Sequence, residues 1–331
     1  MKRFWTTEKY RLQQARRSRK EALRRRPRRG QVYSRGSGGE VQLTAPTELS
    51  LFDHPGETLV FCNDLRAATG RNNTRVMLDL SGVTRFSSDA LFLMRAIMDA
   101  GKGWHTNVGG NLPSNGEVAA KIKATGFFAG FARPPGKLPD AKGLILRKSQ
   151  RRVFSEIAAD LVRFAQSNAS ISREVANACS HTLVEAMTNT HGHAGTLKRR
   201  RGKPIPQAWS AGVYCEEGAA HFTFVDLGVG IFRSAPARGY LQGLKEQLNV
   251  YGKPRLLRDA FNGVIGSSTG LPGRGLGLPR MKADADAGLL PNLQVLTSDV
   301  IGGVAELNFS TLAESMRGTV LRWKAGEERV S

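Results

Sequence analysis

The chain has 331 residues, of which 40% are hydrophobic and 23% charged, a balance that is typical of a globular protein and excludes a disordered one. Three widely spaced cysteines are a poor basis for a disulfide framework, so we expect a reducing compartment. No apolar run approaches the roughly 20 residues that cross a membrane, and the charged N-terminus lacks the apolar segment of a secretion signal, so we expect a cytoplasmic protein without a membrane anchor.

The first 38 residues predict a basic, flexible tail. They hold fourteen lysine and arginine residues against Glu8 and Glu21, which gives +12 of the +21 net charge of the whole chain. One interpretation is a solvated tail, and the other is an arm that binds the phosphates of nucleic acid through charge. Few aromatic side chains accompany the charge, so we expect no readout of bases.

Residues 40–147 predict a small α/β unit. The stretch RVMLDLSGV, from Arg75 to Val83, is rich in strand-forming apolar residues and ends at a turn. The stretch SSDALFLMRAIMDAG offers serine and aspartate caps and apolar residues at helical spacing, so it predicts a helix that ends at Gly101. A strand end, a polar loop and a short helix are expected over 107–127.

Residues 151–328 predict a larger α/β unit. Amphipathic spacing favours two helices, over 151–168 and 172–194, and the second is expected to be capped by Ser172 or Ser170. The remaining elements are two strands joined by a turn at Glu217–Gly218, a Gly- and Pro-rich connection over 232–277, and two closing strands within 293–299 and 318–325.

The stretch LVEAMTNTHGHAG places a carboxylate and an amide near the end of the second helix. Glu185 and Asn189 are four residues apart and therefore lie on one face. A carboxylate there can polarise an attacking water or hydroxyl, and an amide oxygen can bind Mg²⁺ without adding charge. Such a base and metal ligand suit phosphoryl transfer, which needs mostly positioning and charge neutralisation. A hydrogen-bonded structural pair is the competing interpretation.

Two glycine motifs lie downstream of this helix. In FVDLGVGI a strand delivers Asp226, and Gly228 and Gly230 let the backbone approach a ligand closely. The second motif, GLPGRGLGLPRM, contains Gly273, Gly275 and Gly277. Neither motif has the Gly-Lys-Ser/Thr of a Walker loop or the spacing of a dinucleotide fingerprint, and each by itself is typical of an ordinary turn.

Taken in order, four signals over roughly 153–325 resemble the GHKL ATPases: acid-x-x-x-Asn on a helix, Asp-x-Gly-x-Gly after a strand, Gly-x-Gly-x-Gly before a helix, and Gly-Thr entering a strand. The resemblance implies a Bergerat-type α/β sandwich that binds ATP and Mg²⁺. It assigns Glu185 as the catalytic base, Asn189 as the metal ligand and Asp226 as the acceptor for the adenine amino group. It also implies nucleotide-binding roles for Thr319, Gly228, Gly230, Gly273, Gly275 and Gly277.

The helix-borne motif is most similar to that of the bacterial anti-sigma serine kinases, in which an acid precedes asparagine by four residues and His-Gly follows. The helix expected from residue 151 contains no histidine, so a histidine autokinase is not expected. The resemblance therefore implies slow ATP hydrolysis or Ser/Thr phosphoryl transfer.

The stretch VMLDLSGVTRFSSDALFLMRAIM, within roughly 75–130, resembles the STAS domain of anti-anti-sigma proteins. In that family a turn before a helix carries a phosphorylated serine, and here Asp89 aligns with the acceptor. One interpretation is that Asp89 only caps its helix. The other is that its carboxylate holds the domain in a phosphorylated-like state.

Together these features predict an α/β protein in which a STAS-like domain precedes a GHKL ATP-binding domain, behind a basic tail. We expect a regulatory Mg²⁺-ATP-binding protein that acts as a switch on a protein partner. One rival is a nucleic-acid-associated GHKL ATPase, in which ATP closes a homodimeric clamp and the tail contacts phosphates. The other rival is an ATP-binding module without turnover.

Overall fold

The computed structural model describes residues 35–36, 39–71, 74–101, 106–128, 143–148, 153–194, 209–228, 230–234, 252–264 and 276–326. The fold class is mixed α/β, as the sequence predicts. None of the helices in these residues has the length and apolar character needed to cross a membrane. The basic tail predicted for the first 38 residues lies almost wholly outside the described residues.

A seven-stranded antiparallel sheet, here called the large sheet, forms the centre of the molecule. The turn that the sequence predicts at Glu217–Gly218 is confirmed. These two residues have φ angles of 53° and 83°, the positive values that a tight two-residue hairpin requires. In spatial order the strands are β12 (Ser310–Thr311), β11 (Val300–Gly303), β10 (Gln294–Thr297), β13 (Thr319–Ala325), β9 (Ala219–Asp226), β8 (Trp209–Glu216) and β7 (Gly143–Lys148).

Strand β7 differs from the sequence analysis, which assigned it to the small unit that ends at residue 147. It pairs antiparallel with β8 at the edge of the large sheet. The reason is topological, because an edge strand joins whichever sheet offers it unpaired backbone groups, and its local pattern does not reveal which.

Residues 35–128 form what we call the N-terminal unit. Strands β2 (Glu40–Thr44), β4 (Arg75–Asp79) and β6 (Asn107–Gly110) are parallel, as the helical crossovers between them require. The other elements are β1 (Arg35–Gly36), β3 (Glu48–Leu49), β5 (Arg85–Phe86), α2 (Pro55–Thr69), α3 (Ser88–Gly101) and α4 (Gly116–Ala124).

Helix α2 was not among the elements expected from the sequence, although it has local signals. Pro55 lies in its first turn, with Glu57 nearby, and Arg66 lies in its last turn. These positions suit a helix, since proline is tolerated at the start and charges of this sign complement the dipole at each end.

The helices α5 (Ser155–Asn168), α6 (Arg173–Ala194) and α9 (Gly277–Asp286) accompany the large sheet, with a short α7 (Ile231–Ser234) after β9. The prediction for the start of α6 is confirmed for one of its two candidate caps: Ser172 Oγ accepts a hydrogen bond from the Val175 backbone N–H at 3.2 Å. Residues 252–261 are also helical.

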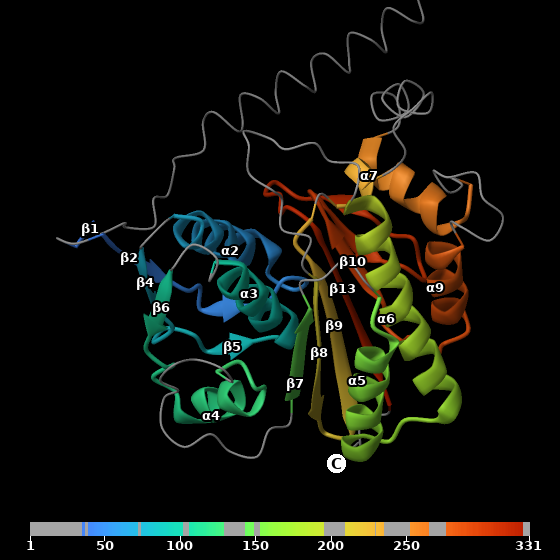
Figure 1. Ribbon diagram of the computed structural model, residues 1–331, viewed down its shortest axis with the longest axis horizontal. Helices are drawn as coiled ribbons and strands as arrows, with labels where there is room; N and C mark the ends of the chain where they lie inside the picture. The colour runs from blue at the N-terminus through green and yellow to red at the C-terminus, as the bar shows by residue number, and fades with distance from the viewer. Residues whose placement is uncertain are drawn as a thin grey trace, which may run out of the picture.

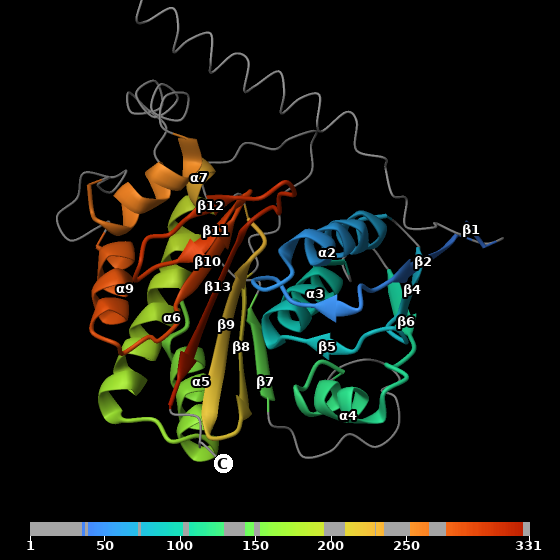
Figure 2. The ribbon, with the colours of Figure 1, turned by 180° about the vertical axis from the view of Figure 1, so that it is seen from behind.

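The elements stack in four layers, which are visible edge-on in Figures 1 and 2. Helices α2 and α3 lie between the small parallel sheet and one face of the large sheet, while α5, α6 and α9 lie on the opposite face. We call these two faces of the large sheet the unit face and the helix face.

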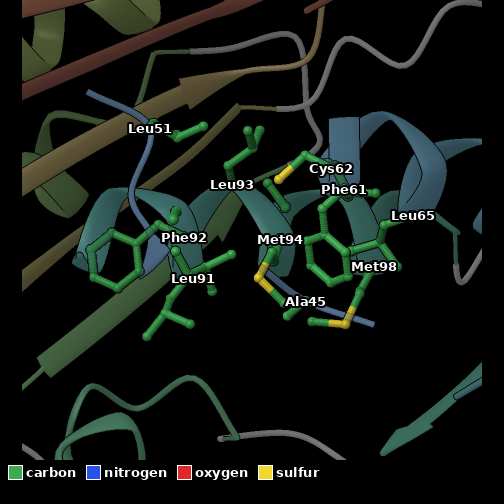
Figure 3. Packing of buried hydrophobic residues seen from close by; sticks show 14 of the residues in the cluster. Ala45, Leu51, Phe61, Cys62, Leu65, Leu91, Phe92, Leu93, Met94 and Met98 are labelled. Carbon is green, nitrogen blue, oxygen red and sulfur yellow. The ribbon is translucent and has the colours of Figure 1, made fainter. Parts of the chain in front are cut away.

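Alternation along each strand divides the apolar residues between the two faces. On β9, Val225 belongs to the cluster shared with α2 and α3, whereas Phe222 and Phe224 belong to the cluster shared with α5 and α6. Figure 3 shows part of the first cluster, in which Phe61 and Cys62 of α2 lie close to Leu93 and Met94 of α3. The N-terminal unit therefore shares one continuous core with the large sheet.

Candidate functional site

Three polar side chains line up where adjacent strands of the large sheet end. Asp226 is the last residue of β9, and its direct neighbour across the ladder is Thr319, the first residue of β13. Thr297, the last residue of β10, is in turn the neighbour of Thr319. Phe224 lies two residues before Asp226, Leu321 lies two residues after Thr319, and both belong to the helix-face cluster. Because residues two apart on a strand share a face, Asp226 and Thr319 point to the helix face.

Asp226 is a half-buried acid whose carboxyl group has few partners within the described chain. Burial raises its pKa to about 6, while the Gly228 backbone N–H, which donates to Oδ1 at 2.7 Å, and the charges of Arg66 and Arg317 act in the opposite direction. A carboxylate with two oxygens can accept several hydrogen bonds. Asp226 therefore retains the capacity to accept a donor from a bound molecule.

The threonines and glycines beside Asp226 are tightly packed. Thr297 Oγ1 contacts Thr319 Oγ1 at 3.1 Å and accepts the Ile231 backbone N–H at 3.1 Å. A side chain at position 230, where φ is +78°, would place its Cβ 2.9 Å from Thr297 Oγ1. A Cβ at position 228 would lie 2.8 Å from Asp226 Oδ1. Both glycines are thus required by close approach of the backbone to these polar groups.

The helix α6 carries Glu185 and Asn189, both half-buried, on one face. The start of α9 packs directly against this face, because a Cβ at Gly277 would overlap Glu185 Oε2. The structure therefore brings together Glu185 and Gly277, two residues that the sequence placed in different motifs. Helix α6 packs on β9 and β13, the strands that carry Asp226 and Thr319.

Two of the predicted site residues, Gly273 and Gly275, lie outside the described residues, so their roles stay predictions. Helix α9, which follows them, begins without a side-chain cap: the residue at its N-cap position is Leu276. Within the described part of the chain, no group of three or more His, Cys, Asp or Glu side chains gathers in a way that could hold a metal ion.

Two neighbours of Asp226 were missed by the sequence analysis. Trp209 lies directly opposite Asp226 in the β8–β9 ladder, is buried, and its indole N–H has no hydrogen-bond partner among the described residues. The turn at Glu217–Gly218 could have revealed it, because a two-residue hairpin turn fixes the register of both strands. Thr297 ends a predicted strand, but nothing local indicates that it lies beside Thr319.

Asp89, the position that aligns with the acceptor serine of STAS domains, lies on the opposite face of the large sheet, the unit face. It is 2% exposed, and its Oδ2 pairs with Arg322 Nη1 of β13 at 2.9 Å. Its Oδ1 accepts the Leu51 backbone N–H at 3.0 Å and the Ser87 hydroxyl at 2.8 Å. Asp89 is therefore a buried ion-pair partner at the junction of the N-terminal unit with the large sheet.

No family model matches this chain, and a search of curated proteins finds no matching relative.

Proposed function

We propose that the large sheet with α5, α6 and α9 is a GHKL-type ATP-binding unit of the Bergerat class, and that the N-terminal unit is STAS-like. The protein would bind Mg²⁺-ATP and use slow hydrolysis or Ser/Thr phosphoryl transfer as a switch on a protein partner. The observation that carries the proposal is the half-buried, sparsely partnered Asp226 beside Thr319 and Thr297 at the end of the large sheet.

The residues at this end suit an adenine base. Asp226 is half-buried and has accepting capacity to spare, and an exocyclic amino group is a donor that would fill it. The orphaned indole N–H of Trp209, in the adjacent strand, is a further sign of incomplete hydrogen bonding there. A buried polar group without a partner is costly, and such groups gather where a ligand completes them.

The residues along α6 suit the phosphate end. Glu185 would accept the proton of the attacking water or hydroxyl as a general base. Asn189, one turn further on, would hold Mg²⁺, which neutralises phosphate charge. Gly277 begins α9 against Glu185, and the free backbone N–H groups at an uncapped helix start suit an anion.

The decisive experiment mixes the full-length protein with Mg²⁺ and γ-labelled ATP, alone and with a lysate. Label released to water indicates a hydrolase, and label on another chain indicates a kinase with a protein substrate. Binding without release indicates an ATP-binding module without turnover. If the folded protein does not bind ATP or ADP at millimolar concentration, the proposal is wrong.

A second candidate function rests on the charge of the first 38 residues. A net charge of +12 in a short segment favours binding to the phosphates of DNA or RNA. We expect such binding to be independent of base sequence and to fall steeply between low and physiological salt. Equal nucleic-acid affinity of the full-length protein and of a variant that lacks residues 1–38 would reject this function.

A further inference from the structure

Arg66 of the N-terminal unit reaches the end of the large sheet where the candidate site lies. Its Nη1 donates to the Arg317 backbone carbonyl at 2.9 Å, and its Nη2 donates to the Leu227 backbone carbonyl at 3.0 Å. Leu227 directly follows Asp226, and Arg317 lies two residues before Thr319. One guanidinium therefore holds the chain just beyond β9 and just before β13.

A second side chain of the same helix makes a similar hydrogen bond. Asn63, one turn before Arg66 on α2, donates its side-chain amide to the Ser315 backbone carbonyl at 2.9 Å. The two side chains thus fix the segment 315–317, which leads into β13. Planar guanidinium groups suit this task, because two parallel donors hold a fixed geometry that a single ammonium does not.

The strand ends that Arg66 holds leave little room for displacement. At Gly318, where φ is +107°, an added Cβ would overlap the Asp226 backbone carbonyl. Thr297 Oγ1 also donates to the Gly318 carbonyl at 3.2 Å, so movement of this loop would shift the threonines beside Asp226. The spacing of β9 and β13 at the site therefore depends on contacts made by the N-terminal unit.

Arg66 also contributes charge. Burial, followed by the nearby Arg317, lowers its pKa to about 10, so it remains protonated at neutral pH. Arg66 from α2 and Arg317 from the loop before β13 both favour the ionised form of Asp226. On the helix face, Glu185 of α6 lies against the start of α9, and α9 itself carries Asp284 and Asp286.

We propose that Arg66 is a positioning residue of the nucleotide site, so that the N-terminal unit, docked on the unit face, completes a site whose ligand-binding groups lie on the helix face. The inference rests on the nucleotide binding proposed above. Its consequence is reciprocal coupling: a nucleotide that needs the docked arrangement stabilises docking, and loss of docking weakens nucleotide binding.

The test measures ADP affinity between pH 5 and pH 8 for the wild type, Arg66→Met and Arg66→Lys. The matched control is Arg85→Met, which removes an exposed arginine of the same unit that contacts Glu48. For the wild type we expect affinity to fall as the pH drops through about 6, when Asp226 protonates. For Arg66→Met we expect at least tenfold weaker binding at pH 8 and a midpoint shifted to higher pH, because a positive charge near the carboxylate is lost.

The lysine variant separates charge from geometry. It keeps the positive charge but cannot donate to both carbonyls as a fork, so we expect a midpoint close to that of the wild type with weakened binding. Affinity and midpoint unchanged in folded Arg66→Met, with the wild type binding ADP, would overturn the inference and leave the proposed function intact. Weaker binding without a shifted midpoint would assign Arg66 a purely structural role and also overturn it. No binding by the wild type would remove the proposed function itself.

Discussion

Two aspartates on opposite faces of the large sheet, Asp226 and Asp89, have contrasting surroundings. Asp226 on the helix face has one hydrogen bond within the described chain, from Gly228, and burial raises its pKa to about 6. Asp89 on the unit face is more deeply buried and meets three donors, which are the Leu51 N–H, the Ser87 hydroxyl and the Arg322 guanidinium. A buried carboxylate with its partners in place stabilises the fold, whereas one that lacks them is a candidate for binding a ligand.

The largest expected effect concerns Glu185, the proposed general base of the site that contains Asp226. Glu185→Gln should lower the rate of phosphate release or transfer by about 10²- to 10⁴-fold, because a general base acts in the transition state. ATP affinity and the free energy of unfolding should change little. The control is Glu174→Gln, an exposed acid in the first turn of the same helix. A wild-type rate for Glu185→Gln, measured with γ-labelled ATP, would exclude Glu185 as the base.

The second-largest effect concerns Asp89, the aspartate whose hydrogen-bond partners are in place. Asp89→Ser should lower the free energy of unfolding by about 3 kcal/mol in a denaturant titration, because removing the buried partner leaves Arg322 with only the exposed Asp53 as an ionic partner. A residue that only caps α3 would tolerate serine within a few tenths of a kcal/mol.

Asp53→Ser is the matched control for Asp89→Ser. Asp53 contacts the same arginine at 3.2 Å, but its side chain is 60% exposed, so its loss should cost less than about 1 kcal/mol. Equal stabilities of the Asp89 and Asp53 variants would favour the cap interpretation of Asp89.

A third change, Asp226→Asn, should act in opposite directions on function and stability. ATP affinity should fall roughly ten- to hundredfold, because a charged acceptor is lost. The free energy of unfolding should rise above pH 6, because in the wild type desolvation makes it costly to keep this carboxylate ionised. Calorimetric ATP titration and denaturant unfolding measure the two effects.

The pH dependence follows from the raised pKa of Asp226. An unfolded aspartate ionises near pH 3.9, whereas folded Asp226 ionises near pH 6. The free energy of unfolding of the wild type should therefore decrease as the pH rises from about 4 to about 6, and this contribution should be constant above that. Asp226→Asn lacks this titration. A variant that is less stable than the wild type at pH 7 would indicate a structural role for Asp226 instead.

The smallest effect is expected for the metal ligand. Asn189→Ala should reduce the enhancement of ATP affinity by Mg²⁺ by about fivefold, as expected when one neutral polar contact is lost. ATP titrations with and without Mg²⁺ provide the measurement, and Asn168→Ala, at the exposed end of α5, is the control. An unchanged Mg²⁺ dependence would exclude Asn189 as the ligand.

Features that depend on local chemistry were determined by the sequence alone. The i, i+4 spacing places Glu185 and Asn189 on one face, and Ser172 caps their helix. The turn at Glu217–Gly218 sets the register of β8 against β9 and so fixes Trp209 opposite Asp226. Turn geometry and helical periodicity depend on residues close together in the chain, so they can be predicted from the sequence.

Other features were decided by the tertiary structure. Strand β13 inserts between β9 and β10, and only that pairing brings Thr319 beside Asp226 and Thr297. The local pattern around Asp89 predicts a cap, yet its main partner, Arg322, comes from β13. Arg66 likewise meets its acceptors only because α2 docks on the large sheet. Pairing between strands distant in sequence depends on the packing of whole layers, since antiparallel strands with similar apolar alternation can pair in several orders until the core selects one.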